Sequence, residues 1–240
     1  MTEPAAIPAP RPGRRWRRRF LFLLLIALVA GGTLLWTLWR SKPTYWQILD
    51  PASPAVQSEA AEIERQLPTL LTRVRPDEPT WTLEVSQTQI NAWLSARLPQ
   101  WLSNQGVNSQ VTGSVRNPMV AIFPDRIEIA AEVNPLGREQ VVRALFRPDY
   151  GNPQAAAIRF HRLMGGRLPL PSSWLADQVL ARLDHRHEEA RSLVERIVVK
   201  GEPWLLVQPV DRHRQVRVVD LRLETGRLVL TCRTELKPPR

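Results

Sequence analysis

The order of hydrophobic and polar positions changes sharply after the first 40 residues of the chain. Residues 20–39 follow one another without a single charge. A helix rises about 1.5 Å per residue, so this run would span roughly 30 Å, the thickness of the hydrocarbon layer of a bilayer. It has no polar face, which distinguishes it from the amphipathic helix of a protein surface. We therefore predict a transmembrane helix over residues 20–40.

The next pattern is that of an amphipathic helix. Ser53 and Pro54 provide an N-cap and a first-turn proline. Hydrophobic residues then recur at three- and four-residue steps: Val56, Ala60, Ile63, Leu67, Leu70, Leu71 and Val74. Residues 41–78 are thus predicted to be a juxtamembrane linker and amphipathic helix. The helix either covers its own domain or pairs with a second copy as a stalk.

A short strand and a second helix are predicted next. Residues 80–85 alternate as in a strand, and Ser86 and Gln89 form an S-x-x-Q capping box. The helix behind this box would present these apolar positions: Ile90, Trp93, Leu94, Leu98, Trp101 and Leu102. Pro99 lies inside the pattern and should kink or divide it.

The remaining residues alternate in short runs separated by turns. Strands are predicted at residues 107–115, 120–122, 127–133, 140–147 and 155–163, then a loop at 164–171, a long helix at 172–197 and a terminal hairpin at 216–235. This order indicates an α+β fold. We expect an N-terminal transmembrane helix followed by one domain, residues 79–240, with a curved, mostly antiparallel sheet packed on long helices.

The charge of the chain narrows the choice of partner. The chain has 240 residues, with 33 Lys and Arg against 23 Asp and Glu, a net charge of +10. Residues 1–46 carry +7 of this, which leaves +3 for the other 194 residues. Because the basic residues are not spread over a folded surface, the composition does not favour a nucleic-acid partner.

The basic cluster predicts where the protein lies. Arginines between residues 14 and 19 precede the apolar run, and the positive-inside rule places such clusters in the cytoplasm. We expect residues 1–19 to be a disordered cytoplasmic tail and the domain to be extracytoplasmic, anchored in the inner membrane by one span. The alternative is a cleaved signal peptide, since residues 17–21 fit the twin-arginine pattern RRxFL. The long apolar run and the lack of a nearby A-x-A site favour a retained anchor.

The motifs of common enzymes do not occur in the sequence. It contains no GxSxG, GxxxxGK[ST] or GxGxxG pattern, and Cys232 is its one cysteine. The densest group of possible metal ligands is Asp184, His187 and Glu188, which would share one face of a helix. We favour a solvated helix face as the explanation of these residues, and a metal-dependent hydrolase is the less favoured hypothesis. We predict neither catalytic residues nor a cofactor.

Large aromatic rings are the remaining feature of the domain. Of the nine Trp residues, Trp93, Trp101 and Trp174 are the candidates for lining an apolar groove between a sheet and a long helix. The predicted function is that of a non-enzymatic, membrane-anchored envelope protein whose domain binds a lipid or another apolar ligand. The alternative is a scaffold or secretion-apparatus component that acts through contacts with an envelope protein partner.

Two short segments resemble a known family. Residues 83–94, LEVSQTQINAWL, resemble the strand and S/T-x-x-Q-h-N-x-h-L opening of the YpmS-like family of bacterial single-pass membrane proteins. Residues 166–171, GRLPLP, resemble that family's later G-x-L-P-L-P segment. The resemblance implies a bacterial envelope protein and transfers no catalytic residue.

Overall fold

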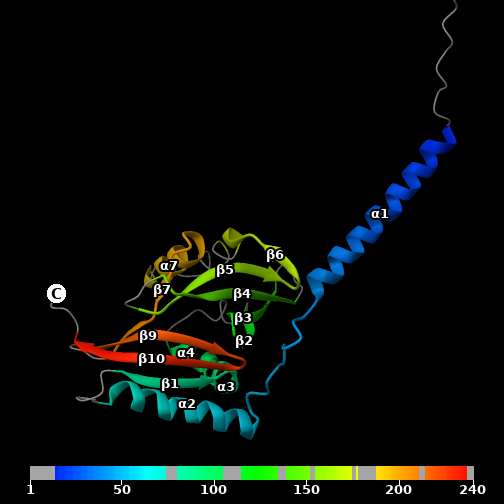
Figure 1. Ribbon diagram of the computed structural model, residues 1–240. Coiled ribbons are helices and arrows are strands. Elements are labelled where there is room, and N and C mark those ends of the chain that lie inside the picture. Colours follow the sequence, from blue (N-terminus) through cyan, green and yellow to red (C-terminus); the bar gives the residue numbers. More distant parts are fainter. Residues whose placement is uncertain are drawn as a thin grey trace, which may run out of the picture.

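The computed structural model describes residues 14–73, 80–104, 115–134, 139–151, 155–174, 177, 188–210 and 214–236. Helix α1, Arg14–Arg40, projects from a domain built of two sheets and several helices (Figure 1). Its segment Arg19–Arg40 has a mean hydropathy of 2.4, is not buried by the rest of the chain, and is long and apolar enough to cross a membrane. Residues 14–19 of the predicted tail thus begin α1, while residues 1–13 lie outside the described part.

Helix α2, Pro54–Thr72, confirms the predicted amphipathic helix, with Pro54 in its first turn. Figure 1 shows α2 running along the outer side of the domain beside β1. Its hydrophobic residues pack against the core: Ile63, Leu67, Leu70 and Leu71. The face that a stalk would need for pairing with a second copy is therefore turned towards the helix's own domain.

The strands form two antiparallel sheets, where we expected one. The first sheet has the order β1 (Trp81–Ser86), β10 (Arg227–Leu236), β9 (Arg214–Glu224) and β8 (Val207–Pro209). The second has the order β2 (Val115–Phe123), β3 (Arg126–Val133), β4 (Gln140–Asp149), β5 (Ala157–Gly165) and β6 (Leu168–Leu170), and β7 (Trp204–Leu205) also pairs with β5. The terminal hairpin β9–β10 is confirmed, with Gly226 in its turn at a φ of 72°.

Backbone hydrogen bonds join the two sheets at two places. Near the start of β5, the Ala156 N–H donates to the Val218 carbonyl at 2.8 Å, and the Val218 N–H donates to Leu206 at 2.9 Å. At the hairpin turn, the Gly226 N–H donates to the Ile122 carbonyl at 2.9 Å. A shared core contains residues of both sheets: Trp81, Leu83, Val85, Ile122, Ile158, Val216, Val218, Leu221 and Leu223. The two sheets therefore belong to one domain with one core.

The helix predicted after β1 is confirmed as two helices, α3 (Gln87–Ala96) and α4 (Leu98–Asn104). Ser86 caps α3, and the reciprocal bond from the Ser86 N–H to the Gln89 side chain completes the capping box. The division falls at Arg97, two residues before Pro99, whose ring disfavours a continuous helix.

Helix α3 covers the free edge of the second sheet. The Asn91 side chain accepts from the Val120 N–H at 2.7 Å and donates to the Val120 carbonyl at 2.9 Å, as a neighbouring strand would. The Gln87 side chain accepts from the Ile122 N–H at 2.9 Å. These bonds satisfy backbone groups that an edge strand otherwise leaves unpaired. The polar residues of the QTQIN segment therefore serve the fold.

The long helix predicted at 172–197 lies only partly within the described residues, and those of its residues that are described are helical. Residues 172–174 are helical, and α7, Glu188–Val194, continues into one π-helical segment, Glu195–Val199. Most of the residues between them lie outside the described part. The predicted loop at 164–171 contains instead a tight β5–β6 turn, with Gly166 at a φ of 57°, followed by the short strand β6.

Candidate functional site

The three tryptophans predicted to line a groove lie on three different helical segments. The Trp93 ring on α3 donates to Glu64 of α2 at 3.2 Å. Trp101 on α4 is 49% exposed, and Trp174 is half-buried in the helical turn after β6. None of them lines the pocket described below. Their role in ligand binding stays a prediction.

The predicted metal cluster is only partly within the described residues. Asp184 and His187 lie outside them, while Glu188 is exposed at the start of α7, 4.0 Å from Arg191. Within the described ranges, no three His, Cys, Asp or Glu side chains lie close enough to hold a metal ion.

The structure instead draws attention to the junction between α1 and the second sheet. The last carbonyl groups of a helix have no partner within the helix and need one elsewhere. Here the Arg167 N–H donates to the Leu38 carbonyl at 2.9 Å, and the Gln140 side-chain amide donates to the Trp39 carbonyl. The domain therefore caps the end of α1 with groups of β4 and of the β5–β6 turn.

Two glycines permit this close approach. A Cβ atom at Gly166 would overlap the carbonyl oxygens of Leu38 and Trp39, and one at Gly165 would overlap the Trp39 ring. Gly166 also needs its positive φ to make the turn. The Gly165–Gly166 pair of the MGGR segment is thus the platform on which the last turn of α1 rests.

Beyond α1, the linker crosses the second sheet and binds two buried acids of β3. The Lys42 ammonium lies 3.1 Å from Glu132, and the Tyr45 hydroxyl donates to Glu128 at 2.7 Å. Glu128 is only 1% exposed and Glu132 only 5%. Both acids point to the same face of β3, because side chains four residues apart along a strand share a face.

Two arginines neutralise the Glu128 carboxylate. The Arg126 Nε lies 2.7 Å from one carboxylate oxygen, and the Arg143 Nη1 lies 3.0 Å from the other, which also accepts from Tyr45. Burial pushes the pKa of Glu128 upwards, but the hydrogen bonds from Arg126 and Tyr45 and the charge of Arg143 outweigh it and hold that pKa below its usual value. Burial, together with the bond to Glu128, raises the pKa of Tyr45. Glu128 is therefore a carboxylate and Tyr45 a neutral donor at neutral pH.

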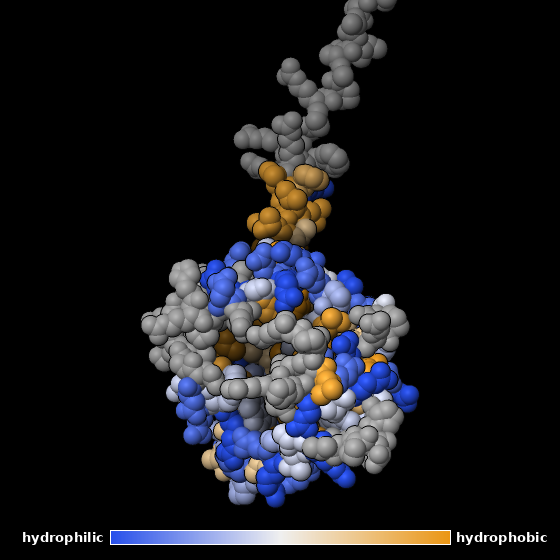
Figure 2. Space-filling view, turned by 90° about the vertical axis from the view of Figure 1, so that its left-hand side faces the viewer, coloured by the Kyte–Doolittle hydropathy of each residue, from blue (hydrophilic) through white to orange (hydrophobic). Residues whose placement is uncertain are grey.

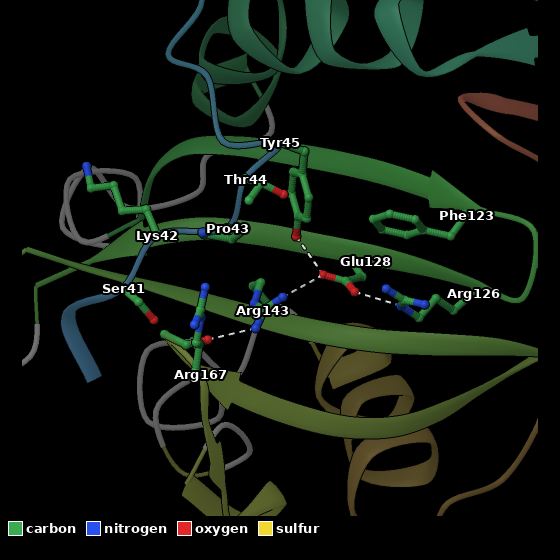
Figure 3. A pocket seen from close by; sticks show the side chains of 11 residues that line it. Ser41, Lys42, Pro43, Thr44, Tyr45, Phe123, Arg126, Glu128, Arg143 and Arg167 are labelled. Carbon is green, nitrogen blue, oxygen red and sulfur yellow. Dashed lines mark hydrogen bonds and ion pairs between the residues drawn. The ribbon is translucent and has the colours of Figure 1, made fainter. Parts of the chain in front are cut away.

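These residues surround a pocket of about 230 Å³ between the linker and the second sheet (Figure 3). It is lined by Ser41, Lys42, Pro43, Thr44, Tyr45, Phe123, Arg126, Glu128, Arg143, Gly166 and Arg167. Phe123 forms an apolar wall, with its ring 5.8 Å from that of Tyr45 and the Arg126 guanidinium 4.1 Å above it. Four cations line the pocket against one acid, so its chemistry suits an anion.

Sequence reasoning did not find this pocket. The alternation of Ile127, Ile129, Ala131 and Val133 predicted β3 correctly, and it directed attention to the apolar face of that strand. The opposite face carries Glu128 and Glu132, which are more deeply buried than the 42% exposed Ile129. The usable signal was the spacing of two acids on one face of a strand, with a Lys and a Tyr just after the apolar N-terminal helix.

A comparison with models of known protein families finds none that matches this chain, and a comparison with curated proteins finds no similar one. The resemblance to the YpmS-like family therefore stays a prediction.

The Gly166→Ala substitution should release the end of α1 from the domain. The added methyl group overlaps two backbone carbonyls, which cannot move without unwinding the last turn of the helix. In the full chain in detergent micelles, hydrogen exchange at the Arg167 amide should accelerate at least tenfold. Gly201→Ala is the matched control, since Gly201 also has a positive φ of 67° but has nothing within 4 Å of the added methyl group. Equal exchange in both variants would show that the glycine platform does not hold the anchor.

Glu128→Gln should destabilise the domain by about 3 kcal/mol at neutral pH, because it leaves two partly buried arginines without their carboxylate. The folded-state pKa of Glu128 is lowered, so its stabilising effect is complete above the unfolded-state pKa of about 4.3 and is lost as the pH falls below it. Chemical denaturation between pH 7 and pH 3 should therefore show a smaller loss of stability in the variant than in the wild type. Glu84→Gln, at an exposed ion pair with Arg227, should cost less than about 1 kcal/mol. Equal costs for the two substitutions would contradict the assigned role of Glu128.

Proposed function

We propose that the protein is anchored in the inner membrane by α1 and that its extracytoplasmic domain binds a lipid without catalysing a reaction. The observation that carries this proposal is the docking of the last turn of α1 on the Gly165–Gly166 platform. A rigid junction of this kind holds the domain against the membrane surface, next to the supply of lipid.

The docking also favours a retained anchor over a cleaved signal peptide. Removal of α1 would leave the Gln140 side chain and the Arg167 N–H without their carbonyl partners, and would uncover Gly165 and Gly166, which are buried. Such groups cost free energy when they lose their partners. The arginines at residues 14–19 support an N-terminus in the cytoplasm, since such clusters stay on that side.

The second sheet offers an apolar face for the lipid's acyl chain. Paired residues of neighbouring strands point to the same side, so Ile129 lies in one row with Val120 of β2, Ala144 of β4 and Leu163 of β5. Ile129 is 42% exposed although it lies in a central region of this face. Figure 2, which views the domain from the left-hand side of Figure 1, shows hydrophobic residues inside a hollow of the domain.

This face begins where the anchor ends. Gly165, which contacts the Trp39 ring, pairs with Val142, and Val142 pairs with Ala131 on the same side of the sheet as Ile129. Ile129 is two residues from Ala131 along β3, which corresponds to about 7 Å. The residues between Trp39 and Ile129 on this face are apolar, and Val142 is only 7% exposed. An acyl chain that leaves the bilayer beside Trp39 would therefore have to displace the groups that cover Val142 before it reached Ile129.

Photo-crosslinking tests this proposal. The full chain would be reconstituted in vesicles that contain a phospholipid with a diazirine in its acyl chain, and labelled peptides would be mapped by mass spectrometry. We expect adducts on residues 127–146 in addition to α1. Ile129→Asn should reduce these adducts roughly tenfold, because it replaces an apolar contact of 1.5–3 kcal/mol by a polar side chain.

The control for this experiment is Leu205→Asn. Leu205 is 43% exposed, close to the value for Ile129. It pairs with Ala157, whose side chain points to the face of β5 opposite that of its neighbour Ile158. Its substitution should leave the adducts unchanged. Adducts confined to α1 in the wild type would refute lipid binding by the domain.

A further inference from the structure

The pocket between the linker and the second sheet is lined by one more cation than the neighbouring carboxylates neutralise. Lys42 pairs with Glu132, Arg126 with Asp125 and Glu128, and Arg143 with Glu128. The fourth lining cation, Arg167, has no ion-pair partner among the described residues, and its side chain is exposed at the pocket. The pocket therefore presents unbalanced positive charge to whatever enters it.

Arg143 lies beside Arg167, and the sheet and the Gly166 carbonyl hold its guanidinium in place. Its Nη1 binds Glu128 and its Nη2 donates to the Gly166 carbonyl at 2.7 Å. Its Nε is buried and has no hydrogen-bond partner within the described ranges. Because this atom is closed to solvent, Arg143 contributes its positive charge to the pocket and not a free N–H group. Figure 3 shows Arg167 beside Arg143, so two guanidinium groups border the same space.

The place of the pocket in the chain indicates the source of the anion. Ser41 and Lys42 line it, and they directly follow Arg40, the last residue of the apolar span. The end of a membrane-spanning helix lies at the level of the lipid headgroups, where phosphates are the main anions. The volume of about 230 Å³ holds several water molecules at about 30 Å³ each, and so has room for a phosphate and its ester groups.

We propose that this pocket binds the phosphate of an anionic phospholipid headgroup, with Arg167 as its donor and the positive charge of Arg143 beside it. Guanidinium groups suit phosphate because their planar N–H pairs match two of its oxygens. Phe123 and Pro43 provide apolar walls for the ester-linked carbons. The Tyr45–Glu128–Arg126 cluster fixes the floor of the pocket, so its shape is set before the lipid arrives.

The inference rests on the proposed membrane anchoring but not on the apolar face at Ile129. The full chain would be purified in mixed micelles with equal amounts of phosphatidylglycerol and phosphatidylcholine, and bound lipids counted by native mass spectrometry. The wild type should retain phosphatidylglycerol over phosphatidylcholine by about tenfold, because the choline group of the second lipid neutralises its phosphate. Arg167→Gln should reduce this preference to about twofold or less, as expected for the loss of one charge-assisted bond to phosphate.

Arg222→Gln is the matched control and should keep the wild-type preference. Arg222 is an exposed arginine of β9 that pairs with Asp220 and does not line the pocket. Because the arginines at residues 14–19 are present in all three proteins, their attraction for anionic lipid cancels from the comparison. A preference that survives Arg167→Gln, or that is absent from the wild type, would overturn the inference.

Competition with inorganic phosphate tests whether the pocket binds a lipid headgroup or a free anion. If an excess of it leaves phosphatidylglycerol bound, the lipid assignment stands, because the glycerol and acyl parts add contacts that phosphate lacks. Complete displacement would overturn that assignment. If the preference depends on Arg167 while no acyl adducts form near Ile129, the headgroup pocket stands and the proposed acyl-binding face fails.

Discussion

The capping of α1 by the domain is the interaction on which the rest of the arrangement depends. The last carbonyls of the helix take their hydrogen bonds from Arg167 and Gln140, and two glycines let the helix approach the sheet closely. From there the linker crosses the acidic face of β3, where Lys42 and Tyr45 bind Glu132 and Glu128. Helix α1, the pocket and the apolar face of the second sheet thus meet at a single junction at the C-terminal end of α1.

The buried charges beside this junction are explained by the same constraint. A carboxylate as deeply buried as Glu128 is tolerated only with partners, and Tyr45 of the linker is one of the three that it has. In the same way, Lys42 of the linker pairs with the buried Glu132, closer to α1. Each pair ties the linker to the sheet, so the cluster contributes to the position of the domain as well as to its stability.

Local rules predicted the elements of the fold well. The apolar run, the capping box at Ser86, the division at Pro99 and the terminal hairpin all depend on neighbouring residues, and the structure confirms them. The separation into two sheets depends on long-range contacts, such as the bond between Gly226 and Ile122, which alternation does not encode. The pocket was missed for a related reason, because Tyr45 and Glu128 are 83 residues apart and each resembles an ordinary surface residue until the linker brings them together.

The most direct test of the account is the distance between the anchor and the domain in the wild-type background. Spin labels at Leu34→Cys on α1 and Arg222→Cys on β9 would report it by pulsed electron resonance in nanodiscs, since both sites are exposed and the native Cys232 is buried. A docked helix predicts one narrow distance distribution. A broad distribution, as given by a domain on a flexible tether, would contradict the account.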